Sequence, residues 1–265
     1  DDFAAFMGKS IEIVALSTLE IGRLVGDEGH DIVQFGKQVD AIIDWYVRSD
    51  SPYKSAADLK GKKVVHPGWS TGTAQMSDVL LKSWYGIDMK KDMKVVSAPW
   101  PVGPKLLAKG DVEMAMNLVP LSMGLWRAGK IRPILATAAS VWAKKRNTSH
   151  NLSITNFLGW GKWVRGNEKI ARAWLSLYSE GQKYAHENTV AWATKYRNRI
   201  KKNASDAELA WFIKWFKKHG VVYKEANIDE TFISEETAFL RMCKEAGYIK
   251  KVLGPESWKI LKLLD

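Results

Sequence analysis

Along the first two thirds of the chain, short runs of apolar and β-branched residues alternate with amphipathic stretches of helical spacing. The apolar runs predict strands over residues 11–16, 31–35, 41–47, 63–66, 94–98, 112–117, 131–137 and 157–164. The stretches between them predict helices from about residue 18, over 73–84, over 103–109 and over 121–128. This alternation is typical of βαβ units around a parallel sheet, so we expect an α/β fold.

The final third of the chain has helical spacing almost throughout. The predicted helices cover residues 168–187, 191–201, 206–219, 235–246 and 255–263. Each carries apolar residues at three- and four-residue intervals, which indicates a helix with one face packed on a core. Residues 49–57, which include Pro52, are interpreted as a connector, and residues 62–137 as one contiguous parallel-sheet lobe.

The composition of the 265-residue chain is that of a folded protein large enough for two lobes, with 46% hydrophobic and 26% charged residues. Its 13 tryptophans are unusually many. We expect most of them in cores, while a surplus of flat side chains also suits a pocket that stacks a ring or an apolar tail. No run of about 18 apolar residues occurs, so the sequence encodes no transmembrane helix.

The formal net charge of +11 is compatible with an anionic ligand, an acidic partner or nucleic acid. The basic residues are spread through the predicted helices, and no zinc-finger, helix-turn-helix or ribonucleoprotein motif lies beside them. We therefore expect no nucleic-acid partner.

Residues for catalysis or metal binding do not occur in a recognisable pattern. The five histidines lack the spacing of metal ligands, and the G-x-S-x-G and G-x-G-x-x-G motifs are missing. Cys243 is the single cysteine, which excludes an internal disulfide, a cysteine-based zinc site and a cysteine-ligated iron–sulfur cluster. We expect no enzyme activity, no metal and no cofactor.

A series of short motifs runs through the chain. The most extensive, SPYKSAADLKGKKV at residues 51–64, continues into GWSTGT at residues 68–73. The others are STLE at 17–20, LAKGDV at 107–112, GW at 159–160 and EAGYI at 245–249. In this order, and over essentially the whole chain, they resemble the type II periplasmic binding proteins of bacterial ABC importers. The most similar branch is the one that binds nitrate, sulfonates, taurine and thiamine-precursor pyrimidines.

The resemblance implies a two-lobed α/β fold with a central cleft and a helical C-terminal part. Residues 58–157 would form lobe two, and residues 1–57 together with 158–265 would form lobe one. The family normally opens with a strand, a helix and a second strand ahead of the segment that matches residues 2–17, and these are missing here.

The same resemblance implies the solute-binding component of an ABC transporter. Such a protein captures a small organic ligand, here anionic or aromatic, in the cleft and delivers it to a permease in the inner membrane. It would act as a monomer, in the periplasm or as a cell-surface lipoprotein. Two alternatives stay open within the fold: an enzyme similar to the yeast-type synthase of the thiamine pyrimidine, and a ligand-sensing domain. The synthase carries a cysteine-rich segment, which a chain with Cys243 alone lacks.

The first candidate ligand contacts lie between a predicted strand and a predicted helix, and they are Trp69, Ser70, Thr71, Gly72 and Thr73. At such a junction, hydroxyls and unpaired backbone N–H groups converge on one point, which suits an anion. The alternative is ordinary helix capping by serine or threonine.

The other candidate contacts also lie next to predicted strands. Ser17 and Thr18 repeat the strand-to-helix pattern in lobe one, again with capping as the alternative. Asn117 ends a strand, where its amide either contacts a ligand or forms a turn. Trp100 and Trp160, like Trp69, line either the pocket or a core.

Overall fold

The computed structural model describes residues 2–135, 138–219 and 225–264, which form two compact units. The first unit comprises residues 1–41, 148–186 and 221–265, and the second comprises residues 42–147 and 187–220. Each unit has its own β-sheet. These units differ from the predicted lobes, because residues 42–57 and 187–220 group with the second unit and residues 148–157 with the first. Whether the two lobes, with the predicted bounds, move as bodies around a ligand stays a prediction.

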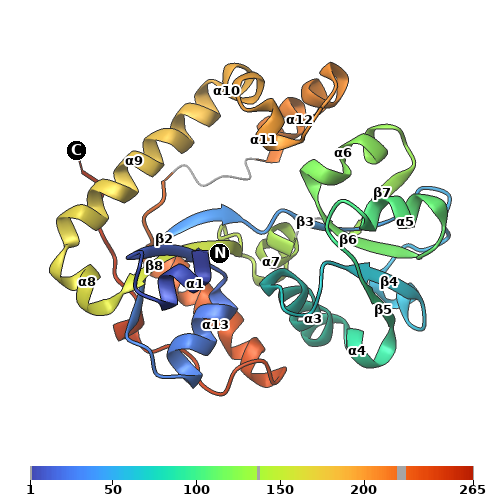
Figure 1. The fold of residues 1–265 in the computed structure, drawn as a ribbon. Coiled ribbons are helices and arrows are strands. Elements are labelled where there is room, and N and C mark those ends of the chain that lie inside the picture. The colour runs from blue at the N-terminus through green and yellow to red at the C-terminus, as the bar shows by residue number, and fades with distance from the viewer. Residues whose placement is uncertain (1, 136–137, 220–224, 265) are drawn as a thin grey trace. The chain divides into compact units, whose positions relative to one another are not determined.

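The first unit is built on a three-stranded sheet (Figure 1). Its strands are β1 (Ile13–Leu16), β2 (Ile32–Asp40) and β8 (Ser153–Trp160). Its helical elements are α1 (Asp2–Met7), α2 (Thr18–Ile21), the π-helix η1 (Gly22–Asp27), α8 (Gly161–Gly166), α9 (Glu168–Glu187), α13 (Glu230–Glu245) and the 3₁₀-helix η3 (Pro255–Ser257). The strand order is β1-β8-β2, and both pairings are antiparallel. The predicted parallel sheet is therefore wrong for this unit, because apolar alternation reports the burial of a strand and not the direction of its neighbour.

One face of this sheet packs against α9. Phe35 of β2 and Phe157 of β8 form a core with Ala171 and Leu175 of α9. The contact is closest at Gly36, where an added Cβ would lie 2.4 Å from a methyl carbon of Leu175. A residue with a side chain at this position would push α9 away from the sheet.

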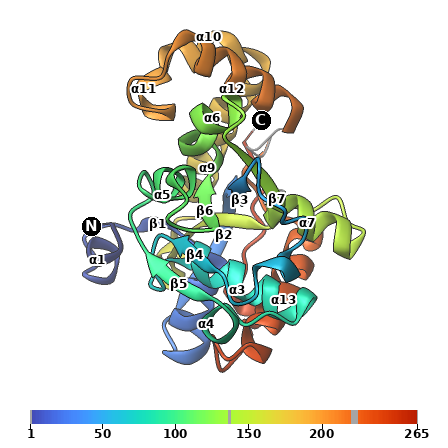
Figure 2. The same cartoon turned by 90° about the vertical axis from the view of Figure 1, so that its right-hand side faces the viewer.

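The second unit is built on a five-stranded sheet (Figure 2). Its strands are β3 (Ile43–Arg48), β4 (Lys63–His66), β5 (Lys94–Ser97), β6 (Met114–Leu118) and β7 (Ile131–Leu135). Its helical elements are the 3₁₀-helix η2 (Ala56–Leu59), α3 (Gly72–Tyr85), α4 (Met89–Asp92), α5 (Gly103–Lys109), α6 (Val119–Arg127), α7 (Ala138–Arg146), α10 (Thr189–Lys195), α11 (Arg197–Ile200) and α12 (Asp206–His219). The strand order is β5-β4-β6-β3-β7.

Strand β3 corrects the predicted lobe sheet. β4 is parallel to β5 and β6, as predicted, but β3 lies between β6 and β7 and is antiparallel to both. The sheet is therefore mixed, and residues 62–137 do not form a contiguous sheet without β3. β3 comes from the part of the chain before residue 58, which was assigned to the other lobe. The local sequence pattern of a strand does not indicate which strands it will pair with.

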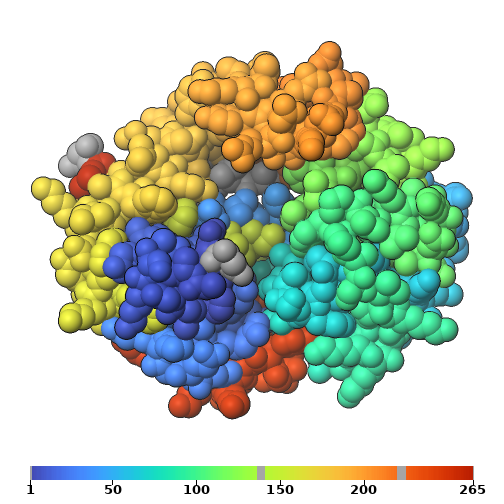
Figure 3. Space-filling view, viewed as in Figure 1, coloured from blue at the N-terminus to red at the C-terminus, as the bar shows by residue number. Residues whose placement is uncertain are grey.

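Helices cover both faces of the five-stranded sheet. On one face, Ser77 of α3 accepts a hydrogen bond from the indole N–H of Trp45 (3.2 Å). On the other face, Tyr46 and Ala115 pack with Leu107 of α5. Helix α12 packs on α6, where the rings of Trp211 and Trp126 lie 5.0 Å apart. Figure 3 shows this contact from outside, with the orange surface of α10–α12 next to the green surface of α6.

Several predicted boundaries are corrected. Residues 161–164 are helical in α8, not the end of a strand. The predicted helix over 255–263 is wrong, because a single 3₁₀ turn is followed by extended chain in which Lys259 donates to the carbonyl of Gln34 (2.9 Å). Helix α13 begins five residues early, at Glu230, after the N-cap Asp229, whose carboxylate accepts the N–H of Phe232 (2.7 Å). Helices α1, α4 and α7 have no predicted counterpart, and residues 136 and 137 of a predicted strand lie outside the described residues.

Candidate functional site

The candidate site in the second unit lies at one edge of the five-stranded sheet. Strands β4, β5 and β6 are parallel, so their carboxyl ends share this edge, and the antiparallel β3 begins there. Trp69–Thr73 follow β4, Trp100 follows β5, and Asn117 lies near the end of β6. The topology therefore brings the predicted contacts of this unit to a single edge, which is where ligands bind in open α/β sheets.

The turn between β4 and α3 is held by its own hydrogen bonds. Gly68 has φ +130° and donates its N–H to Nδ1 of His66 (2.9 Å). The Thr71 hydroxyl donates to the carbonyl of Gly68 (2.8 Å) and accepts from the N–H of Ala74 (3.3 Å). Thr71 is thus the N-cap of the 14-residue helix α3, and the capping interpretation describes its side chain correctly.

Capping leaves other donors of this turn unused. In the described part of the chain, the backbone N–H groups of Ser70, Gly72 and Thr73 have no hydrogen-bond partner. They lie at the positive end of the α3 dipole, and the Ser70 side chain is exposed. The turn therefore keeps the donors that an anion needs even though Thr71 is engaged.

His66, which was not among the predicted contacts, supports this turn. Its ring is buried, and its edge contacts the Trp69 ring with centroids 4.4 Å apart. Burial lowers the pKa of His66, and because Nδ1 accepts the N–H of Gly68, the assigned proton of the neutral ring is on Nε2. A histidine at the last position of a predicted strand, two residues before glycine, was the available sequence signal.

Asn117 faces a second unpredicted residue, Asp44. The two residues are partners in the β3–β6 pairing, and both are buried. Asn117 Oδ1 accepts the N–H of Leu118 (2.9 Å), and Asp44 Oδ2 accepts the hydroxyl of Tyr46 (3.2 Å). Burial raises the pKa of Asp44 to about 7. The sequence signal for Asp44 was its place as a single acidic residue inside the apolar run 41–47. Such a residue is expected to be buried, but its position alone does not indicate a function.

The two tryptophans of this edge are partly exposed. Trp69 and Trp100 are both half-buried, and Trp100 lies in a turn closed by the N–H of Val102 donating to the carbonyl of Pro99 (2.8 Å). Each ring has one part available to a ligand and another part packed on the protein. Their role as pocket residues stays a prediction.

The remaining predicted contacts belong to the first unit, and their polar groups are engaged there. Ser17 forms a capping box with Glu20, in which its hydroxyl accepts the N–H of Glu20 (3.2 Å) and its own N–H donates to the Glu20 carboxylate (2.9 Å). The Trp160 indole N–H donates to the carbonyl of Phe6 (3.3 Å), and the two rings stack.

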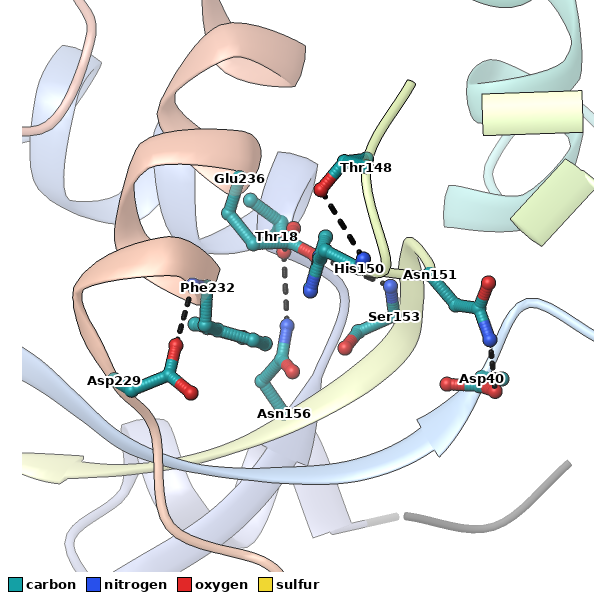
Figure 4. A network of polar contacts seen from close by, with 10 residues as sticks. All are labelled: Thr18, Asp40, Thr148, His150, Asn151, Ser153, Asn156, Asp229, Phe232 and Glu236. Atoms are coloured by element: carbon teal, nitrogen blue, oxygen red, sulfur yellow. Dashed lines mark hydrogen bonds and ion pairs between the residues drawn. The ribbon is translucent and has the colours of Figure 1, made fainter. Parts of the chain in front are cut away.

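Thr18 belongs to a buried network that Figure 4 shows. It donates to Glu236 Oε2 (2.5 Å) and accepts from the amide of Asn156 (2.8 Å). The capping alternative thus describes Ser17, whereas the Thr18 hydroxyl is engaged in the network and caps no helix. Their role as ligand contacts stays a prediction.

Metal-ligand clusters and membrane-spanning helices both bear on the class of site. Among the described residues, His, Cys, Asp and Glu side chains do not gather in groups of three or more that could hold a metal ion. Within the same residues, none of the helices combines the length and the apolar character that a membrane span requires.

Comparison with solved structures finds the same fold in binding proteins. The periplasmic aliphatic sulphonate binding protein SsuA from Escherichia coli aligns with a TM-score of 0.72 and 15% identity, covering 99% of this chain and 80% of that one. The alkanesulfonate-binding protein SsuA from Xanthomonas axonopodis pv. citri, bound to MOPS, aligns with a TM-score of 0.71 and 14% identity, covering 97% and 82%. At such identities, the likeness concerns the fold.

The fold also occurs in an enzyme. The desulfurization enzyme DSZB aligns with a TM-score of 0.57 and 14% identity, covering 91% of this chain and 80% of that one.

Comparison with curated protein sequences finds no match. The family model described as NMT1/THI5 like matches residues 14–191. Because this match spans well over half of the chain, the protein belongs to the NMT1/THI5-like family.

Proposed function

We propose that this protein is the solute-binding component of an ABC importer and that it captures a small organic anion. The observation that carries the proposal is the set of unpaired N–H groups of Ser70, Gly72 and Thr73 at the start of α3. Donors of this kind bind anionic oxygens without a charged side chain. The sulfonate-binding proteins of similar fold support the choice of ligand class.

The proposal includes a carrier role without chemistry. We expect the protein to act outside the cytoplasm as a monomer and to pass its ligand to a membrane permease. The highest TM-scores above belong to binding proteins, and the enzyme of this fold aligns less well. Incubation of the protein with a bound anion, followed by mass spectrometry of the small molecule, should therefore recover it unchanged.

The first experiment is to identify the ligand. Native mass spectrometry of freshly purified protein should reveal a retained small molecule, and calorimetry should then measure its affinity. The double variant Ser70→Ala, Thr71→Ala should bind it about tenfold more weakly or worse. It removes the exposed Ser70 hydroxyl, whose hydrogen bond is worth about 0.5–1.5 kcal/mol, and the Thr71 cap that holds the N–H groups of the turn in place. A retained neutral or cationic molecule would contradict the proposed ligand class.

Matched variants separate binding from folding. Thr71→Ala removes the α3 cap and should cost about 1 kcal/mol of stability, whereas Thr71→Ser keeps a capping hydroxyl. Ser83→Ala changes an exposed hydroxyl elsewhere on α3 and should alter neither stability nor affinity. If the loss of affinity in the double variant were explained by destabilised empty protein, the turn would be a helix cap and nothing more.

A further inference from the structure

Two buried polar side chains face each other across β3 and β6, and each has one polar atom without a partner among the described residues. Asp44 and Asn117 are 2% and 0% exposed. As partners in an antiparallel pair, they project their side chains to the same face of the sheet. In the described part of the chain, Asp44 Oδ1 and Asn117 Nδ2 have no hydrogen-bond partner. Buried polar atoms are rarely left in this state, so the unpaired carboxyl oxygen and the unpaired amide nitrogen indicate that another molecule completes them.

The surroundings of Asp44 favour its neutral form. Among the described residues, Tyr46 is the titratable residue that is hydrogen-bonded to Asp44. Burial raises the pKa of Asp44 more than the bond to Tyr46 lowers it. On the neighbouring strands, Arg48 is bonded to Asp50, and Arg132 donates to the carbonyls of Ser51 and Tyr53.

The helices of that face bring no charge to Asp44 either. The charged side chains of α5 and α6 are exposed, and they are Lys105, Lys109 and Arg127. In the β4–β6 pairing Val65 is the partner of Ala115, so the side chain of His66 projects to the opposite face from Asn117. A buried carboxyl without a nearby cation holds its proton more tightly than one in water, and a protonated carboxyl donates a hydrogen bond.

We propose that Asp44, as a neutral carboxyl, and Asn117 are two hydrogen-bond donors for an anionic oxygen of the ligand, and that Asp44 makes ligand affinity depend on pH. This inference rests on the proposed function and adds two contacts to the turn that precedes α3. Both groups lie at the edge where β3 begins and β6 ends, the edge that the turn shares. Both are covered in this structure, so the proposal requires this edge to open when the ligand binds.

The proposal predicts the direction of the pH dependence. Ionised Asp44 would repel an anion and could not donate, so affinity should fall as the pH rises through the pKa of Asp44, which is about 7. Where one protonation state binds, affinity falls by up to tenfold for each pH unit above that pKa. Between pH 6 and pH 8 we therefore expect a loss of about tenfold.

The test uses anions whose own charge does not change in this range. Butanesulfonate, benzenesulfonate and inorganic sulfate are titrated into the 265-residue protein by calorimetry at pH 6, 7 and 8. The wild type should show the tenfold loss. Asp44→Asn, which cannot ionise, should show a ratio near one between pH 6 and pH 8. Asp44→Leu, which has no donor, should bind at least tenfold more weakly at pH 6.

The outcomes separate this inference from the proposed function. Ser70→Ala should lower affinity by the same factor at each pH and leave the slope intact. If the wild type binds a probe with no pH dependence, or if Asp44→Asn keeps the wild-type slope, the inference about Asp44 is wrong and the proposed function stands. If the wild type binds none of the probes at pH 6, 7 or 8, both the anionic ligand class and the inference are wrong. Circular dichroism of each variant identifies any that fail to fold.

Discussion

The side chain of Glu236 is bonded to several residues inside the first unit. Its carboxylate accepts from the Thr18 hydroxyl (2.5 Å) and from the backbone N–H of Ser153 (3.1 Å), and it contacts the ring of His150 (3.2 Å), as Figure 4 shows. The carboxylate is fully buried, so these contacts replace the water it loses on folding. Asn156 Oδ1 has no partner among the described residues, so the stabilisation by this network comes from the contacts of Glu236.

Replacement of Glu236 by alanine should therefore be costly. Glu236→Ala leaves the donors from Thr18 and Ser153 without an acceptor, and we expect a loss of about 3 kcal/mol or more in the free energy of unfolding. Urea unfolding followed by circular dichroism measures it. Glu245→Ala, an exposed glutamate of the same helix, is the control and should change stability by less than about 0.5 kcal/mol. Equal effects of the two variants would contradict the role given to the network.

Asp44 should give the empty protein a pH dependence of its own. Its pKa is raised from 3.8 to about 7 in the folded state, so the folded protein holds this proton more tightly than the unfolded chain. The sign follows: this stabilisation is fully present below about pH 4 and is lost as the pH rises towards 7, by about 4 kcal/mol in all. Asp44→Asn lacks the effect and should gain stability relative to the wild type between pH 4 and pH 8. Urea midpoints of the two proteins at both pH values measure it, and a constant difference would refute the shift.

At the scale of elements, α3 shows how a helix is delimited by its sequence. It begins at the Thr71 cap and ends at Gly86, which adopts a left-handed conformation with φ +61°. The N–H of Gly86 donates to the carbonyl of Lys82 (3.2 Å), and the next N–H, of Ile87, donates to that of Leu81 (3.2 Å). These bonds satisfy carbonyl groups that the helix leaves unpaired.

A pair of glycine variants tests this ending. An added Cβ at Gly86 would meet nothing within 4 Å, so Gly86→Ala adds only the strain of a left-handed backbone, about 1 kcal/mol. Gly181 lies inside α9, and there too an added Cβ meets nothing within 4 Å. Gly181→Ala should therefore stabilise the protein by up to about 1 kcal/mol, because alanine favours helix. Thermal unfolding should move in opposite directions for the two variants, and a shift in the same direction would show that the backbone does not decide the effect.

The elements that the sequence predicted well are those with strong local signals. Strand β4 and helices α5, α9 and α12 have their predicted bounds, because alternation, glycine ends and apolar periodicity all act within a few residues. The place of β3 between β6 and β7 depends on residues far apart in the chain and was not predictable from the pattern. The helix predicted over residues 255–263 was wrong for another reason. Trp258 and Leu261 are buried in extended chain, but their three-residue spacing is also that of one face of a helix.

At the scale of the whole molecule, the order of the motifs carried more information than any single motif. With 15% identity to a protein whose structure covers 99% of this chain, few individual positions are informative, but the order of turns and strands indicates the family. Only part of the candidate site could be predicted from the sequence. The junction before α3 is a local feature and was predicted, while the Asp44–Asn117 pair depends on strand pairing and was not.

Ligand binding should stabilise the whole protein, and the size of the effect gives a screen for the ligand class. A molecule that binds only the folded protein at a concentration 100 times its Kd adds about 2.7 kcal/mol to the free energy of unfolding. For a protein of this size, that corresponds to a rise of roughly 5–10 °C in Tm. We expect organic anions, sulfonates among them, to give this rise, and sugars, amines and neutral amides of similar size to give none. The Ser70→Ala, Thr71→Ala variant should show a smaller rise at the same anion concentration, while Ser83→Ala should match the wild type. A rise produced by amines or sugars alone would mean that the N–H groups before α3 do not select the ligand, because those groups can only donate hydrogen bonds and favour negative charge.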